Sequence, residues 1–198
     1  MTPRETFATK APWLMQRLLD ADFGFVVDDT AVIAGNAGHE SNGFTAMQEI
    51  KPRAGRGGFG WFQWTGPRRR AFEAFCARER LDPSSDEANI AFLIVELRGP
   101  ERKAVGAVKA AEGLYNKTVA FERSFERAGV KHYESRLEWA ALALSAYRRA
   151  QEAKPPEQPP VPSPSTPPAI PPRTLAGGLV ALIAAVAALV YHWITKGT

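Results

Sequence analysis

A proline-rich segment near the carboxyl end constrains this chain more than any other feature. Ten of the sixteen prolines lie between Pro155 and Pro172, with serine and threonine between them and almost no large apolar side chain. Such a segment cannot build a core and is typical of an extended spacer, which at about 3.1 Å per residue would reach roughly 55 Å. The composition therefore divides the chain into a folded domain at 1–152, a linker at 153–173 and a separate segment at 174–195.

The segment after the linker is predicted to be a transmembrane helix. Leu175 to Ile194 is a run of 20 residues without a formal charge, and its length matches a hydrocarbon thickness of ~30 Å. Tyr191 and Trp193 near its end are typical of an interfacial aromatic belt. Basic residues flank both ends, so the positive-inside rule leaves the orientation open. We expect residues 175–194 to be a single-pass C-terminal anchor in the bacterial inner membrane.

Residues 1–152 carry the patterns of seven helices and little sheet. Apolar residues recur at helical spacing, and the S-x-x-E box at Ser84–Glu87 is a typical helix start. Residues 41–64 instead combine six glycines or prolines with several aromatic residues, which favours loops and a small β-hairpin. Helices are expected at Lys10–Asp22, Thr30–His39, Gly66–Leu81, 84–98, 100–112, 117–128 and 133–152. The predicted fold class is α+β, mostly α.

Neither the charge nor the cysteine and histidine residues indicate a nucleic-acid-binding or metal-binding protein. Twenty-five basic and 21 acidic residues give a net charge of +4, and no nucleic-acid-binding motif accompanies them, so nucleic acid is not an expected partner. Cys76 lies in a helical pattern and is expected to be a buried thiol. Trp13 is likewise expected to be part of the core. His39 and His132 lack metal-ligand spacing, so neither a metal nor another cofactor is expected.

The stretch that points to chemistry begins at Ala31 and ends at Phe44. Its first part is a helix of small residues that delivers one carboxyl group, Glu40, before Ser41-Asn42-Gly43 breaks the pattern. Each glycine in that helix costs roughly 1 kcal/mol of helix propensity, so we expect close packing around it. The segment Gly57–Pro67 follows with glycines and aromatic rings, which is the composition of a cleft wall. One acid beside flat rings favours glycoside chemistry, because the acid protonates a leaving oxygen and the rings stack on sugars.

These residues resemble a known family. Gly35-Asn36 with Glu40-Ser41, followed by Gly60-Trp-Phe-Gln63-Trp-Thr-Gly-Pro67, is similar to the phage tail lysozyme family, and Phe92–Leu97 and Phe121–Gly129 resemble its later helices. The resemblance covers roughly residues 10–150. It implies a lysozyme-like domain that cleaves the β-1,4 bond between N-acetylmuramic acid and N-acetylglucosamine in peptidoglycan, for host cell-wall degradation during phage lysis or entry.

Two alternatives to this muramidase stay open. The Glu-Ser pair with Gly-x-x-Gln also occurs in goose-type lysozymes and lytic transglycosylases, and the latter form 1,6-anhydromuramyl products. The second alternative is a non-catalytic, membrane-anchored murein-binding module. Because murein is the implied partner, the domain is expected to act in the periplasm, although Met1–Leu19 contains no apolar run long enough for a secretory signal peptide. A cytoplasmic, tail-anchored store that is released when the membrane is disrupted is equally allowed.

The candidate site residues follow from the motif. Glu40 is predicted to be the general acid, and Glu49, nine residues later, is the candidate for the second carboxylate that glycosidases normally use. The resemblance to goose-type lysozymes and lytic transglycosylases leaves open that one glutamate suffices. Arg53 and Arg56 would oppose protonation of Glu40 at close range, so they are expected either to point away from it or to bind substrate. The predicted substrate-binding residues are Ser41, Phe44, Trp61, Gln63 and Trp64, with Gln63 orienting water or an acetamido group and Ser41 bonding the helix end.

Overall fold

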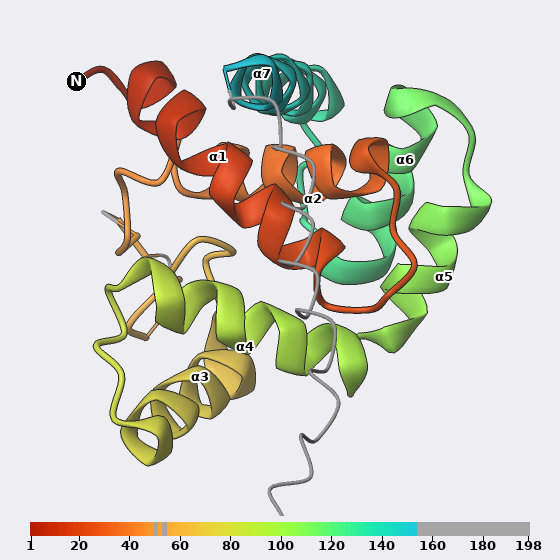
Figure 1. Ribbon diagram of the computed structural model, residues 1–198. Coiled ribbons are helices and arrows are strands. Elements are labelled where there is room, and N and C mark those ends of the chain that lie inside the picture. The colour runs from red at the N-terminus through yellow and green to blue at the C-terminus, as the bar shows by residue number, and fades with distance from the viewer. Residues whose placement is uncertain (50, 53–54, 154–198) are drawn as a thin grey trace, which may run out of the picture. The chain divides into compact units, whose positions relative to one another are not determined.

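The computed structural model describes residues 1–49, 51–52 and 55–153, and these form a helical domain (Figure 1). Its elements are α1 (Pro3–Leu19), α2 (Val27–Glu40), α3 (Gly66–Glu79), α4 (Asp86–Arg98), α5 (Arg102–Ala110), α6 (Gly113–Phe121), the π-helix η1 (Glu122–Glu126) and α7 (Tyr133–Glu152). The prediction of seven α-helices is confirmed for this part of the chain. The π-helical turn that continues α6 was not predicted.

Helix α2 lies at the centre of the domain and packs against α1, α6 and α7, as Figure 1 shows. Ten of its 14 residues are buried, which confirms the prediction of a thin helix inside the domain. A Cβ atom added to Gly35 would lie 2.5 Å from the backbone nitrogen of Ala140 in α7, and one on Gly38 would lie 2.5 Å from the Phe7 ring in α1. The glycines therefore lower helix propensity but allow two neighbouring helices to approach α2 closely.

Several predicted helix starts were wrong: α2 and α6 begin three and four residues earlier than expected, and the starts of α1 and α4 are set by side-chain caps at other residues than predicted. Helix α1 begins seven residues earlier than Lys10, since Thr2 and Glu5 form a capping box in which the Thr2 hydroxyl accepts a hydrogen bond from the Glu5 N–H. Helix α4 is capped by Ser85, whose hydroxyl accepts from the N–H of Ala88. Ser84 instead donates to Asp82 in the preceding turn, at 2.7 Å.

The predicted β-hairpin is reduced to two isolated bridges within the described residues, Gln48 with Phe59 and Phe59 with Trp64. Positive φ angles at Gly57, Gly60 and Gln63 turn the backbone too often for a ladder to extend. The described domain is therefore almost entirely helical, and the β part of the predicted fold class is corrected to these two bridges.

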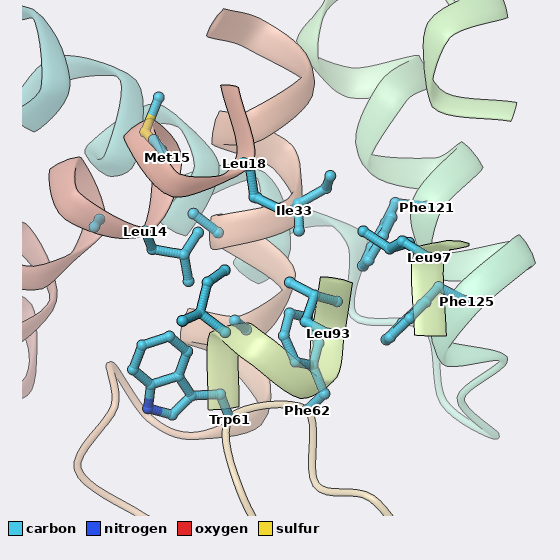
Figure 2. Packing of buried hydrophobic residues seen from close by; sticks show 14 of the residues in the cluster. Leu14, Met15, Leu18, Ile33, Trp61, Phe62, Leu93, Leu97, Phe121 and Phe125 are labelled. Carbon is cyan, nitrogen blue, oxygen red and sulfur yellow. The ribbon is translucent and has the colours of Figure 1, made fainter. Parts of the chain in front are cut away.

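The rings of the glycine–aromatic segment belong to the hydrophobic core. Figure 2 shows Trp61 and Phe62 among Leu14, Ile33 and Leu93, which come from α1, α2 and α4.

Cys76 and Trp13 were both predicted to be buried, and the prediction is confirmed only for Cys76. Cys76 is buried, as expected. Trp13 is 38% exposed, although its ring meets that of Trp61 edge-to-face at a centroid distance of 6.5 Å, so its assignment to the core was wrong.

None of the helices between Pro3 and Glu152 has the length and apolar character needed to cross a bilayer. The predicted anchor at 174–195, and the linker from residue 154 onward, lie outside the described residues.

Candidate functional site

Glu40 is the last residue of α2 and its side chain is 20% exposed. The chain leaves the helix at once, because the hydroxyl of Ser41 donates to the carbonyl of Ala37 at 2.7 Å and accepts from the N–H of Phe44 at 2.9 Å. Ser41 is completely buried, so its predicted role at the helix end is what the hydrogen bonds show. This turn fixes the position of Glu40 at the edge of a rigid helix.

Arg136 of α7 holds the carboxyl group of Glu40. Its Nη2 lies 2.5 Å from Oε1 of Glu40, its Nη1 donates to Oδ1 of Asn36 at 2.9 Å, and its Nε donates to the carbonyl of Lys131 at 2.9 Å. Arg136 is only 1% exposed. A carboxylate at the C-terminal end of a helix meets the negative pole of the helix dipole, so an arginine here offsets an unfavourable interaction.

Histidine 39 lies beside this ion pair and is neutral at physiological pH. Its Nδ1 lies 2.9 Å from the hydroxyl of Ser135, and its ring centroid is 5.4 Å from that of His132. Burial lowers the pKa of His39 to about 4, and the positive charge of Arg136 and the neighbouring His132 add to this effect. The described residues contain no group of His, Cys, Asp or Glu side chains that could hold a metal ion.

A second carboxyl group, which the sequence analysis did not single out, faces the same charges. Glu126 is the last residue of η1, and its Oε1 atom is buried without a hydrogen-bond partner. Burial raises the pKa of Glu126 well above its usual range, and the negative charge of Glu40 raises it further. Arg136 and Arg68 act in the opposite direction with smaller effects. Burial of Glu126 and the charge of Glu40 therefore disfavour simultaneous ionisation of the two carboxyl groups.

The charges continue from Glu126 to a paired group on α3 and α4. Arg68 donates through Nε and Nη2 to both carboxylate oxygens of Glu96, each at 2.8 Å. Nη1 of Arg68 also donates to the carbonyl of Phe125 at 3.3 Å. The guanidinium group of Arg68 lies 4.4 Å from the centre of the Phe125 ring. Glu96 also accepts from the indole N–H of Trp64 at 2.7 Å. Glu96 is therefore saturated with donors, whereas Glu126 is not.

Glu49, the predicted second carboxylate, lies in a different setting. It lines a cavity of about 710 Å³, and neither Glu40 nor Arg136 is among the residues that line it. Its Oε2 accepts from the N–H of Gly58 at 2.8 Å, which ties two parts of one loop together. The lining residues are Glu49, Gly55, Arg56, Gly57, Thr65, Gly66, Arg69 and Arg70. Nη2 of Arg56 lies 2.6 Å from Oε2 of Glu73, so Arg56 is paired with a carboxylate other than Glu40. Arg53 lies outside the described residues.

The predicted substrate-binding residues are mostly inside the domain. Trp61, Trp64 and Phe44 are 0%, 1% and 5% exposed, so in this conformation none of these rings offers a face to a sugar. Gln63 is half-buried, and its Nε2 donates to the carbonyls of Ala46 at 3.1 Å and Gly60 at 2.9 Å. The side-chain amide of Gln63 is therefore occupied by main-chain carbonyl groups.

The sequence held one signal for Glu126. The tripeptide Phe-Glu-Arg occurs twice, at 121–123 and 125–127, and each glutamate follows a phenylalanine that is buried in the core. A carboxyl group next to a buried ring on consecutive helical turns is a candidate for a perturbed pKa. No comparable local signal marks Arg136.

The comparisons with known proteins point to one family. The family model described as phage tail lysozyme matches residues 13–147, which is more than half of the chain. No curated protein and no solved structure gave a match. The matched range contains both carboxyl groups, Arg136 and all elements from α2 to η1. The chain therefore belongs to the phage tail lysozyme family.

Proposed function

We propose that this protein is a muramidase that cleaves the β-1,4 bond between N-acetylmuramic acid and N-acetylglucosamine, with Glu40 as a catalytic carboxyl group. Membership of the family implies a lysozyme-like, peptidoglycan-degrading glycosidase. The assignment of Glu40 rests on the way in which Arg136 fixes its carboxyl group. A buried arginine with three hydrogen bonds holds this carboxyl group at the end of the central helix.

Fixed placement of this kind is what glycoside cleavage requires. A carboxyl group must stay within hydrogen-bond reach of the reacting atoms while the bond between C1 and the bridging oxygen breaks. The partial exposure of Glu40 leaves its carboxyl group accessible to a glycan strand. The biological role that we propose is degradation of the host cell wall during phage lysis or entry.

The test of this assignment is Glu40→Gln. We expect at least about a 10²-fold loss in the rate at which purified protein clears suspended cell walls, because a positioned acid or base contributes typically that much. Glu138→Gln on α7 is the control, since Glu138 forms only an exposed ion pair with Arg4. Circular dichroism establishes that both variants fold. Clearance by Glu40→Gln at the native rate would remove Glu40 from the mechanism.

The product separates a muramidase from a lytic transglycosylase. In the transglycosylase the 6-hydroxyl of the muramyl residue attacks C1 in place of water, so the released fragment is lighter by one water molecule. We expect the hydrated product, identified by mass spectrometry of digested cell walls. A murein-binding module without activity would release no fragments at all and would leave cell walls intact in a zymogram.

Attachment to the inner membrane remains a proposal based on sequence. If residues 175–194 are an anchor, the full chain sediments with membranes after a carbonate wash, and removing those residues releases it. Protease treatment of intact spheroplasts then reports on which side of the membrane the domain lies, and we expect the periplasmic side.

A further inference from the structure

We propose that the cavity beside the first turns of α3 binds the stem peptide that branches from the muramyl residues of peptidoglycan. In this site Arg70 binds a carboxylate group of the peptide, and Glu49 binds its free amino group. The inference rests on the proposed glycosidase function. It names a part of the substrate, other than the sugar chain, that the protein recognises.

The cavity has the size and the lining of a site for a short charged peptide. Its volume is about 710 Å³, within the range of about 300–1,000 Å³ that holds small ligands. It lies between the loop that follows α2 and the start of α3, and four of its eight lining residues carry a charge. No aromatic ring is among the described residues that line it, so it lacks the stacking surface of a sugar site.

The three arginines of the cavity are not equivalent. Arg56 donates through both Nη atoms to the carboxylate of Glu73, at 2.9 Å and 2.6 Å. Arg69 donates through Nε to the same carboxylate at 3.0 Å. These hydrogen bonds lower the pKa of Glu73, so its negative charge is present at neutral pH and offsets theirs. Arg70 is exposed and makes no hydrogen bond or ion pair with any described residue, so its donors are available to a ligand.

Glu49 supplies a negative charge in the same cavity. Its Oε2 accepts from the N–H of Gly58 at 2.8 Å, and the residue is exposed, so a second cation can approach the carboxylate. The cavity therefore presents one available positive group and one available negative group. A stem peptide carries carboxylate groups and, where it is not cross-linked, a free amino group, which is the complementary pattern. A ligand with only negative charges would be repelled by Glu49.

The loop and the helix hold these two charges in fixed places. The backbone N–H of Glu49 donates to the carbonyl of Gly58 at 3.0 Å, beside the bond that its side chain accepts. Nη1 of Arg69, which is 8% exposed, donates to the carbonyls of Arg56 at 2.7 Å and Gly57 at 3.0 Å and so ties the loop to α3. A site that is already formed loses less conformational entropy when its ligand binds.

A glycan strand bound at Glu40 can also reach this cavity. Glu49 follows Glu40 by nine residues, and an extended chain spans at most about 3.6 Å per residue, so the two Cα atoms lie within about 30 Å. The turn after α2 shortens this distance, because the N–H groups of Thr45 and Ala46 donate back to the carbonyl of Ser41, at 3.1 Å and 2.8 Å. Stem peptides branch along the whole glycan strand, so one can occupy the cavity while a glycosidic bond lies at Glu40.

The experiment measures KM and kcat of the full chain on soluble glycan strands that carry stem peptides, and on the same strands after an amidase has removed the peptides. We expect a KM about tenfold lower for the strands with peptides, because a hydrogen-bonded charge pair contributes about this much binding. Arg70→Gln should raise the KM for these strands about tenfold, and the loss should fall on KM rather than on kcat. Arg78→Gln is the matched control, since Arg78 is also exposed on α3 but does not line this cavity.

Three results would overturn the inference. The first is an equal KM of the native protein for the two kinds of strand, and the second is a native KM in Arg70→Gln. The third is an equal rise of KM on both kinds of strand, because Arg70 would then act on the sugar chain or on the fold. If the native protein cleaves neither kind of strand, the proposed function fails instead.

Calorimetric titration of the full chain with free stem peptide tests the two charges separately and does not depend on catalysis. Glu49→Gln should weaken binding about two- to fivefold, as expected for an exposed ion pair. Acetylation of the amino group of the peptide should weaken binding to the native protein by the same factor, without a further effect in Glu49→Gln. Tighter binding of the peptide by Glu49→Gln, or inorganic phosphate that binds the native protein as tightly as the peptide does, would identify a general anion site and overturn the inference.

Discussion

The end of α2 and the glycine–aromatic segment from Gly55 to Gly66 were both expected to line one cleft, and the structure treats them differently. Around Glu40 the charged groups are buried, and helices that are far apart in sequence bring them together. In the segment from Gly55 onward the rings are buried and the charged side chains border an open cavity. The comparison shows that the helices position the carboxyl groups, while the loop contributes its aromatic side chains to the core.

The two regions also differ in how their contacts are made. The link between Glu40 and Arg136 joins residues 96 positions apart, so its geometry depends on the packing of α2 against α7. The contacts of Gln63 and Glu49 join residues within one loop. A contact that depends on tertiary packing is lost when the packing is disturbed, and a local contact is not. Four predictions test this difference, from the largest expected effect to the smallest.

The first prediction is that Arg136→Met lowers the free energy of unfolding by about 3 kcal/mol, since removing one partner of a buried ion pair leaves the other uncompensated. Arg56→Met is the matched control in the loop. Its ion pair with Glu73 is exposed, so it should cost only about 0–1 kcal/mol. Urea denaturation measures both, and similar losses in the two variants would show that the clamp on Glu40 is no stronger than a surface pair.

The second prediction concerns the glycines that let the helices meet. Gly35→Ala should cost about 1–3 kcal/mol, because its Cβ would lie 2.6 Å from Cα of Ala140 and force α2 and α7 apart. Cell-wall clearance should fall as well, since the distance between Glu40 and Arg136 depends on this contact. Gly106→Ala in α5 is the control. A Cβ there meets nothing within 4 Å, so that variant should be as stable as the native protein or up to about 1 kcal/mol more stable. A stabilised Gly35→Ala would contradict the close approach.

Features that depend on local sequence could be predicted, whereas features that depend on tertiary packing could not. The helices could be predicted because apolar spacing and caps are local, and Glu40 because it lies in a local motif. The hairpin was wrong because glycine and aromatic content does not reveal the φ angles at Gly57 and Gly60. Trp61 was taken for a surface residue because the sequence does not say which side of a loop meets the core.

The partners of Glu40 could not be predicted for a related reason. Arg136 and Glu126 approach Glu40 only after α7 and η1 have packed on α2, and no spacing within the chain encodes that encounter. The repeated Phe-Glu-Arg indicates a carboxyl group beside a buried ring, but not which of the two copies lacks donors. Only the positions of Ala128, Lys131 and Tyr133 around Glu122 decide that.

The third prediction uses the lowered pKa of His39. In the unfolded chain the imidazole takes up a proton below about pH 6.5, while the folded protein holds it neutral down to about pH 4. The unfolded state therefore binds more protons between these values, and the free energy of unfolding falls as the pH is lowered through this window. The raised pKa of Glu126 acts with the opposite sign, so the comparison must be made between variants.

The variant that isolates this effect is His39→Gln. Its unfolding free energy, measured by urea denaturation from pH 7 to pH 4, should depend less on pH than that of the native protein. Parallel curves for the two proteins would mean that His39 is protonated in the folded state, in contradiction to its burial beside Arg136. Nothing in the glycine–aromatic loop should alter this window, because its charged groups are arginines and carboxyl groups paired near the surface.

The last prediction is that Glu49→Gln lowers the rate of cell-wall clearance by less than about tenfold, which is small beside the 10²-fold expected when a catalytic carboxyl group is lost. Glu49 accepts one backbone hydrogen bond from Gly58, and the amide oxygen of glutamine can accept the same bond, so the loop should keep its shape. The cavity that Glu49 lines is bordered by Arg56, Arg69 and Arg70, and loss of one negative charge there leaves a more positive surface without touching the Glu40–Arg136 pair. Rates measured side by side for Glu40→Gln and Glu49→Gln decide between the two regions. A loss in Glu49→Gln as large as that in Glu40→Gln would move the second carboxylate back to the loop, where the sequence first placed it, and would require the loop to approach α2 when the glycan binds.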